Sequence, residues 1–239
     1  MTEEIFRDEP YTKSCEAHIT AHVEGGIILD RTVFYPEGGG QPGDTGILRM
    51  ADGSHARITQ TLKGKGEVDG EIVHLIEDGA VLPVDGETVT AELDWDRRYN
   101  HMRMHTCLHL LCSIIDGGVT GGSIGAEKSR LDFDLQDTAL DKEQITADLN
   151  ALVEADHGLS ISWISDEEML ERTELVRTMS VKPPMGQGRV RLMEIAGVDL
   201  QPCGGTHVHS TSEIGRVKIG KIENKGKHNR RVNVVFDND

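Results

Sequence analysis

The feature that most limits the fold of this chain is a change of periodicity near residue 95. Before that point, apolar residues come in short, roughly alternating runs separated by glycine-containing turns, which is typical of β-strands. After it, apolar residues between 104 and 115 recur at spacings of three and four, which is typical of one face of a helix. The sequence therefore predicts an α+β protein with a β domain at 1–95 and an α+β domain at 96–239.

The strands expected in the first domain lie at 15–23, 27–29, 47–50, 55–60, 72–76 and 88–93. Several short strands at this spacing favour a small barrel or a sandwich. In the second domain, helices are expected at 96–115, 142–155 and 165–172, with strands at 129–135, 159–164, 190–195, 215–222 and 231–236. Asp141 is the expected N-cap of the second helix, and Ser165 with Glu168 fits a capping box at the start of the third.

The composition restricts the class of protein further. Lysine and arginine number 25 against 41 aspartates and glutamates, so the formal net charge is −16, which by itself argues against a nucleic-acid partner. No apolar run approaches the ~20 residues that a membrane span needs, and the first twenty residues lack the apolar stretch of a secretory signal. We therefore expect a cytoplasmic protein without a membrane partner, whose four cysteines are free thiols or metal ligands.

The charge is unevenly distributed along the chain. Residues 216–231 carry seven basic side chains against the single acid Glu223, which gives this stretch a charge of +6 and leaves −22 for the rest. Such a basic strip on an acidic protein is expected where a polyanion docks. The alternative is a solvated, lysine-rich pair of strands. The candidate contacts are Lys218, Lys221, Lys225, Lys227, Arg230 and Arg231.

Two short motifs carry candidate metal ligands. His105 and His109 lie four residues apart on a predicted helix and hence on one face, and Cys203 and His207 lie four apart in a glycine-rich turn after a strand. Three imidazoles and one thiolate suit a tetrahedral zinc ion. Spacing alone leaves alternatives open, because His101 shares the helical face and His209 competes with His207. Cys107 and Cys112 are interpreted as buried core thiols, and Cys15 as a strand residue without a chemical role.

These motifs also resemble those of a known family. The segments HTCLHLL (105–111) and CGGTHV (203–208) look like the paired signature of alanyl-tRNA synthetase editing domains, and DWDRR (94–98) resembles the residues that precede its helix. The segment FYPEGGGQPGD (34–44) is similar to the glycine-rich motif of the same proteins. The blocks occur in the family's order over most of the chain, which is too short for an aminoacylation domain. The sequence thus resembles the free-standing alanyl-tRNA editing (AlaX) proteins of medium length.

The resemblance implies a fold, a metal site and a reaction. The fold would be a small β-barrel, the glycine-rich domain, followed by the α+β editing core shared with threonyl-tRNA synthetase. The ligands of one zinc ion would be His105, His109, Cys203 and His207, which leaves His101 without a role. The reaction would be hydrolysis of the ester that joins serine, or glycine as a second candidate, to alanine tRNA.

One tension accompanies this assignment. Four protein ligands form a closed site, whereas catalytic zinc usually keeps an open position. One ligand is loose, or the ion becomes five-coordinate, or zinc positions the substrate while another group activates water; the sequence does not choose among these.

The resemblance also implies roles outside the metal site. Thr120, in VTGGS (119–123), lies where related proteins carry a threonine that senses the serine hydroxyl; the alternative is an ordinary strand threonine. Gly38, Gly39, Gly40 and Gln41 would hold the glycine-rich loop near the active site, or form only a tight turn. The basic segment would contact acceptor-stem phosphates. The competing functions are a non-catalytic tRNA-binding module with structural zinc and a zinc hydrolase for another small ester or amide.

Overall fold

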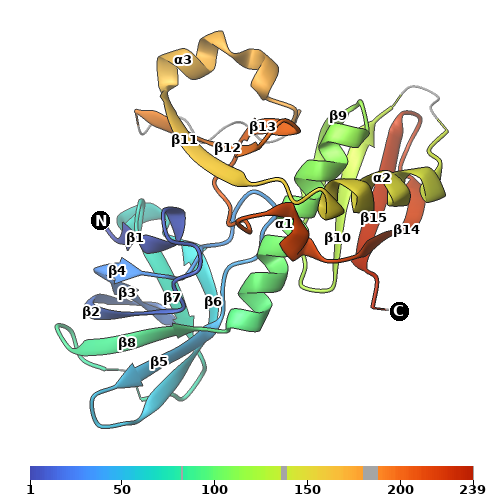
Figure 1. Cartoon of the computed structure of the whole chain (residues 1–239). Coiled ribbons are helices and arrows are strands. Elements are labelled where there is room, and N and C mark those ends of the chain that lie inside the picture. The colour runs from blue at the N-terminus through green and yellow to red at the C-terminus, as the bar shows by residue number, and fades with distance from the viewer. Residues whose placement is uncertain (82, 136–138, 180–187, 239) are drawn as a thin grey trace. The chain divides into compact units, whose positions relative to one another are not determined.

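The computed structural model describes residues 1–81, 83–135, 139–179 and 188–238 (Figure 1). The chain forms two compact units, Met1–Tyr99 and Asn100–Asp239, where the sequence analysis expects a boundary between 95 and 96. Helix α1 (Trp95–Ile114) begins in the first unit and ends in the second. The expected α+β class is confirmed.

The first unit is a closed antiparallel barrel, which decides between the two β architectures that the strand spacing allowed. Around the barrel the order of the strands is β2 (Ser14–Val23), β3 (Gly26–Leu29), β7 (Ile72–Ile76), β6 (His55–Lys63), β5 (Gly46–Met50) and β8 (Thr88–Leu93). Two further strands that the sequence analysis did not predict, β1 (Glu3–Glu4) and β4 (Arg31–Thr32), pair in parallel.

Alternation along the strands fills the inside of the barrel. In β2, Ala17 and Ile19 are buried while the residues between and beside them are exposed, and in β8 Val89 and Ala91 are buried on either side of the half-buried Thr90. These side chains belong to one apolar cluster inside the barrel. Closure gives each of these six strands a paired neighbour on both sides, so none of the six is an edge strand.

The second unit contains two antiparallel sheets. The four-stranded sheet has the order β14 (Val217–Asn224), β15 (Asn229–Phe236), β10 (Lys128–Asp134) and β9 (Gly118–Ser123). The three-stranded sheet has the order β11 (Leu159–Ser165), β12 (Arg189–Ile195) and β13 (Asp199–Pro202). Helix α2 (Lys142–Glu154) is tied to the four-stranded sheet by Asn150, whose side chain exchanges two hydrogen bonds with the backbone of Val217. Strands β9 and β13 were not among the predicted elements.

Both predicted helix starts are confirmed. The Asp141 carboxylate accepts a hydrogen bond of 3.0 Å from the backbone N–H of Gln144 at the start of α2. Ser165 and Glu168 form a reciprocal capping box at the start of α3 (Asp166–Glu171). These bonds satisfy amide groups that the first turn of a helix leaves without partners.

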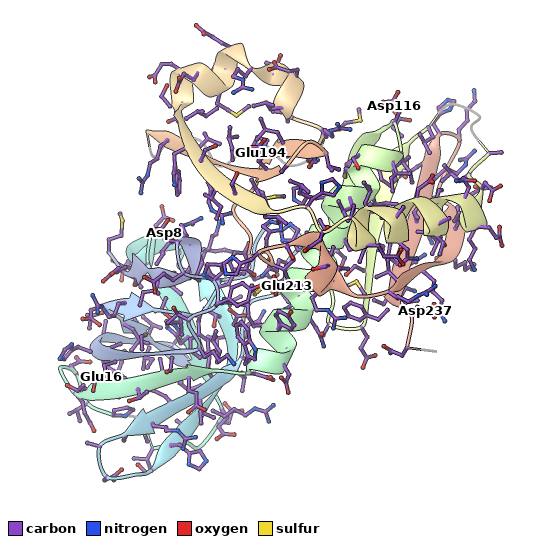
Figure 2. The ribbon with its side chains drawn as sticks, in the orientation of Figure 1. Asp8, Glu16, Asp116, Glu194, Glu213 and Asp237 are labelled. Carbon is purple, nitrogen blue, oxygen red and sulfur yellow. The ribbon has the colours of Figure 1, made fainter. Side chains whose placement is uncertain are left out.

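Acidic side chains occur in both units. Glu16 of the barrel and Glu194 of the three-stranded sheet are two of those labelled in Figure 2. Among the described residues, no helix is both long and apolar enough to cross a membrane.

His74 is a titratable side chain buried in the barrel unit. It lies on β7, its Nε2 is 2.8 Å from the Thr32 hydroxyl, and its ring meets Phe34 edge-on. Burial lowers the pKa of His74 from 6.5 to about 4. Between pH 6.5 and about pH 4, His74 is protonated in the unfolded chain but stays neutral in the folded chain. The free energy of unfolding therefore falls as the pH decreases through this window.

We predict that acid destabilises the protein through His74 by up to about 3 kcal/mol at pH 4, and that His74→Gln flattens this part of the pH profile. Urea unfolding at pH 7, 6 and 5, compared between the variant and the parent, measures the difference. His55→Gln, which changes an exposed histidine of β6, is the matched control. Equal acid sensitivity of parent and His74→Gln, or an imidazole NMR titration that places the His74 pKa near 6.5, would contradict the prediction.

Candidate metal centre

Helix α1 contributes two histidines to a buried cluster. His105 and His109 are separated by about one helical turn, so their rings lie on one face with centroids 5.3 Å apart. Both side chains are more than 90% buried, as are most of their neighbours in the helix. A polar pair in such a position requires partners that compensate for lost hydration.

The other two side chains come from the segment that follows β13. Cys203 comes directly after the strand and His207 four residues later. The buried guanidinium of Arg191, on β12, donates hydrogen bonds to the carbonyls of Cys203 at 2.8 Å and Gly205 at 3.0 Å. Arg191 thereby holds the backbone of the turn from which both side chains project.

The structure brings these four side chains together. One candidate ligand atom from each of His105, His109, Cys203 and His207 lies within 4.8 Å of the others. The Cys203 sulfur is 3.2 Å from His207 Nε2 and 3.5 Å from His105 Nε2. Three nitrogens and one sulfur at this separation fit a single tetrahedral ion of the zinc type. Of the alternatives that spacing left open, His209 is exposed, and His101 is buried but lies outside this group.

Hydrogen bonds to Nδ1 orient two of the three imidazoles. His109 Nδ1 lies 3.1 Å from an oxygen of Asp199, and His207 Nδ1 lies 3.1 Å from the Thr106 hydroxyl. With Nδ1 engaged in this way, each ring directs Nε2 into the cluster, which is the arrangement that polar partners commonly impose on metal-binding histidines.

The cluster shifts the pKa values of its members strongly. Burial raises the pKa of Cys203, but its interactions with the surrounding imidazoles, first of all with His105, outweigh burial and hold the pKa well below the usual value, so the thiolate is favoured. Burial and the neighbouring His105 lower the pKa of His207 to about 3. Burial also lowers the pKa of His109, yet hydrogen bonds to Asp199 and Cys203 overcome it and raise the pKa to about 9. A metal that binds at neutral pH must therefore displace a proton from His109.

The remaining cysteines of α1 behave as predicted. Cys107 and Cys112 are buried, and burial raises the pKa of each thiol to about 12. Neither belongs to the cluster of candidate ligands. Cys15 lies on β2 and is partly buried.

Thr120 lies on β9 of the same unit, where its hydroxyl has a defined hydrogen-bond acceptor. Its hydroxyl donates to the carbonyl of Asp132 at 3.1 Å, with the Asn229 side-chain oxygen 3.4 Å away. A hydroxyl that donates its one hydrogen in this way keeps lone pairs that can accept a hydrogen bond.

The glycine-rich segment belongs to the barrel unit. Gly38 and Gln41 exchange two backbone hydrogen bonds, and Gly39 and Gly40 between them have φ values of 57° and 82°. Two consecutive residues with positive φ make a type I′ turn, which favours glycine at both positions. The Tyr35 hydroxyl donates to the Gly38 carbonyl, and Gln41 is buried.

A buried ion pair anchors the same segment. The guanidinium of Arg98, in the first turn of α1, donates to Asp44 at 2.9 Å and to the carbonyls of Val33 and Pro10. Asp44 in turn accepts the backbone N–H of Tyr35 at 2.6 Å. The ends of the glycine-rich segment are therefore held by one charge network, and the sequence analysis did not identify either ionic partner.

The basic strip follows the β14–β15 hairpin, and its members differ in their surroundings. Arg231 makes two hydrogen bonds of 2.8 and 2.9 Å to Asp132, and Lys218 pairs with Asp237 at 2.7 Å. The others lie at or near the exposed tip of the hairpin: Lys221 and Lys225 near Glu223, Lys227 in the turn, and Arg230 against backbone carbonyls.

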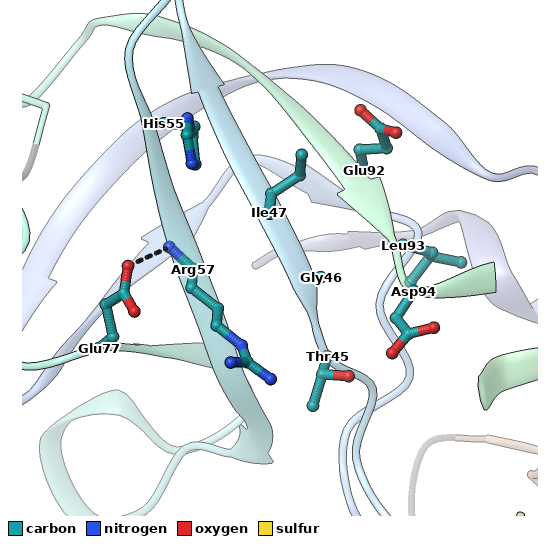
Figure 3. Close-up of a pocket in the computed structure, with 9 residues that line it drawn as sticks. All are labelled: Thr45, Gly46, Ile47, His55, Arg57, Glu77, Glu92, Leu93 and Asp94. Atoms are coloured by element: carbon teal, nitrogen blue, oxygen red, sulfur yellow. Dashed lines mark hydrogen bonds between the residues drawn. The ribbon is translucent and has the colours of Figure 1, made fainter. Parts of the chain in front are cut away.

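A shallow hollow of about 410 Å³ lies on the barrel unit (Figure 3). Arg57, Glu77, Glu92 and Asp94 are among its lining residues, and the backbone N–H of Arg57 donates to Glu77. None of the predicted site residues lines it.

Sequence reasoning missed the residues that support the cluster, namely Asp199, Thr106 and Arg191. A usable signal exists for one of them. Asp199 and Gln201 precede Cys203 at intervals of two, which on a strand places their side chains on one face.

The fold and site define a class of protein in which a β-barrel is followed by an α+β unit with a buried His₃Cys group that could hold a metal ion. Residues 190–233 match the family model of the threonyl and alanyl tRNA synthetase second additional domain, and residues 4–97 match that of class II (A) tRNA synthetases.

Comparison with curated proteins gives the family. The alanyl-tRNA editing protein AlaX-M of Methanosarcina mazei is 39% identical, with 97% of this chain and 95% of that protein covered. AlaX-M of Saccharolobus solfataricus is 37% identical over 97% and 98%. The alanine–tRNA ligase of Pyrobaculum aerophilum is 37% identical over 93% of this chain and 25% of the ligase. The chain belongs to the alanyl-tRNA editing protein family.

We predict that the folded protein binds one zinc ion and that Cys203→Ala weakens binding by more than about 100-fold, because loss of a ligand should exceed the 10- to 100-fold effect of losing an outer partner. Competition with a chromophoric chelator measures the affinity, and circular dichroism reports folding. Cys107→Ala, a buried thiol of α1 outside the cluster, is the matched control. Equal affinity of the Cys203→Ala and Cys107→Ala variants would rule out Cys203 as a ligand.

Proposed function

We propose that this chain is a zinc-dependent hydrolase that acts in trans on mischarged alanine tRNA, removing serine and, as a second candidate, glycine. The observation that carries the proposal is the buried His₃Cys group in a chain that aligns over nearly its whole length with alanyl-tRNA editing proteins. In this proposal residues 1–95 would form the glycine-rich barrel domain, and residues 96–239 would form the zinc-binding editing domain.

His105, His109, Cys203 and His207 would hold the zinc ion. When bound, zinc supplies Lewis-acid chemistry, polarising an ester carbonyl or lowering the pKa of water. The thiolate of Cys203 offsets one of the two charges of the ion, and the burial of the site excludes bulk water and strengthens the interactions within it.

Thr120 would distinguish serine from alanine. Its hydroxyl is oriented by the bond to the Asp132 carbonyl, which leaves its oxygen able to accept a hydrogen bond from the serine hydroxyl. Alanine offers no such donor, so the polar group would be left unpaired and the correct ester would be spared. Gln41 and the turn of Gly38, Gly39 and Gly40 would serve as the loop that faces the substrate.

The basic strip would contact the tRNA backbone. Lys221, Lys225, Lys227 and Arg230 would reach the phosphates, because they lie at or near the exposed tip of the hairpin, where Lys225 can exchange its ion pair with Glu223 for one with a phosphate. Arg231 and Lys218 are paired with Asp132 and Asp237. Phosphate contacts of this kind position an RNA without reading its sequence.

A second function is favoured by one property of the site. Four protein ligands that are all buried correspond to the closed coordination of structural zinc. The alternative is therefore a non-catalytic tRNA-binding module whose zinc only stabilises the fold.

The decisive experiment is deacylation of serine-charged alanine tRNA by the purified protein, with alanine-charged tRNA as the control. We expect rapid loss of serine, retention of alanine, and no activity in the Cys203→Ala variant. Thr120→Val should slow release of serine about tenfold, the value of one hydrogen bond, while Thr120→Ser retains the rate. A zinc-loaded, folded protein that hydrolyses neither ester would instead support the binding module.

For tRNA binding, we predict that replacing Lys225, Lys227 and Arg230 together by alanine lowers the affinity and reduces the dependence of log K on log salt by about 1 for each lost phosphate contact. Filter binding or fluorescence anisotropy over a salt series measures both quantities. Lys65→Ala with Lys142→Ala, exposed lysines outside the strip, is the control. An unchanged affinity and salt slope would remove the strip from the tRNA interface.

A further inference from the structure

One carboxylate beside the cluster of candidate ligands has no role in the proposed chemistry. Asp199, the first residue of β13, is 6% exposed, and its Oδ2 lies 3.1 Å from Nδ1 of His109. Because Nδ1 is the ring nitrogen opposite Nε2, the carboxylate sits behind the imidazole as seen from the cluster. A hydrogen bond at this position determines both the tautomer and the direction of the ring.

The carboxylate is itself held in place. Gln201, on the same face of β13, donates its amide to both oxygens of Asp199, at 3.0 and 2.9 Å. Nε of Arg177 lies 3.7 Å from Oδ1 and supplies a compensating positive charge. Asp199 therefore has a fixed orientation, because one partner, Gln201, lies on its own strand and the other, Arg177, lies in a different segment of the chain.

Arg177 extends the contact to β9. Its guanidinium donates to the carbonyl of Cys112 in α1 at 2.9 Å, and its backbone carbonyl accepts the N–H of Val119 at 3.0 Å. Met179 continues this pairing with a hydrogen bond to Val119 at 2.8 Å. The residue next to Val119 is Thr120, so the chain of contacts runs from a candidate metal ligand to the strand that carries the proposed serine sensor.

The position of Asp199 is not explained by a role as the counter-ion of Arg177. The Arg177 side chain is 39% exposed and can be hydrated, so it does not need a buried counter-ion. What distinguishes Asp199 is that its Oδ2 is directed at the one nitrogen of His109 that coordination through Nε2 leaves available.

We infer that Asp199 is a positioning residue for the metal site, holding His109 as the Nδ1–H tautomer with Nε2 directed at the ion. The inference rests on the proposed zinc site but not on ester hydrolysis. It adds a carboxylate–histidine–metal relay, supported by Gln201 and Arg177, to the four ligands.

The test compares zinc affinity in the full-length protein, Asp199→Asn and Asp199→Ala, by chelator competition. The alanine variant should bind zinc 10- to 100-fold more weakly. The asparagine variant, whose amide oxygen still accepts from Nδ1–H, should recover part of the loss. In long-range ¹H–¹⁵N spectra of the zinc-loaded parent, His109 should show a slowly exchanging Nδ1–H proton, and this proton should exchange faster with water in Asp199→Ala, which lacks the acceptor.

Asp132→Asn is the matched control for affinity, because it changes a similarly buried carboxylate that is paired with arginines and is not among the partners of the cluster. Zinc affinity of Asp199→Ala within threefold of the parent, with unchanged exchange of the His109 Nδ1–H proton, overturns the inference and leaves the zinc site standing. Failure of the parent itself to bind zinc overturns both. If Asp199→Ala does not fold, Asp199→Asn decides: an affinity and His109 spectrum identical to those of the parent refute a role for the charged carboxylate.

Discussion

The second unit depends on keeping four interacting polar side chains, the candidate metal ligands, together out of water. Burying three imidazoles and a thiol costs a large free energy of dehydration unless each side chain has a polar partner. The cluster meets this requirement internally, because a low-pKa thiolate at Cys203 lies among imidazoles and His109 is held as a cation by Asp199 and Cys203. Elements far apart in the sequence have to converge for this to occur: α1, the end of β13, and β12 through Arg191.

Much of the fold follows from local patterns. The strand β8 has the predicted bounds 88–93, β7 has the predicted bounds 72–76, and both predicted caps form. These elements are predictable because alternation of buried and exposed residues, or a capping side chain, is encoded within a few neighbours. Closure of the barrel could not be read in the same way, since it depends on which strands pair across the sheet and not on any one of them.

The candidate ligands were suggested by spacing and by resemblance, but spacing could not separate His105 from His101 on one helical face. Packing makes that distinction, through the approach of the Cys203–His207 segment. Strand β9 was missed because its glycines have low strand propensity, and pairing with β10 compensates for this. The Arg98–Asp44 pair joins residues 54 positions apart, so no local pattern announces it. Charge counting likewise identified the basic strip but not the carboxylates that engage Arg231 and Lys218.

The boundary between the two compact units has a consequence for how such a chain can be divided or recombined. It falls inside α1, after the turn in which Arg98 binds Asp44 and before the turns that carry His105 and His109. A helix is one cooperative element, and a cut after Tyr99 would leave a new helix start with uncapped amides. A cut before Trp95 preserves the helix but deprives the buried Asp44 of the Arg98 guanidinium with which it pairs. Neither cut is therefore neutral: one shortens the helix that carries the two histidines, and the other separates the two partners of a buried ion pair.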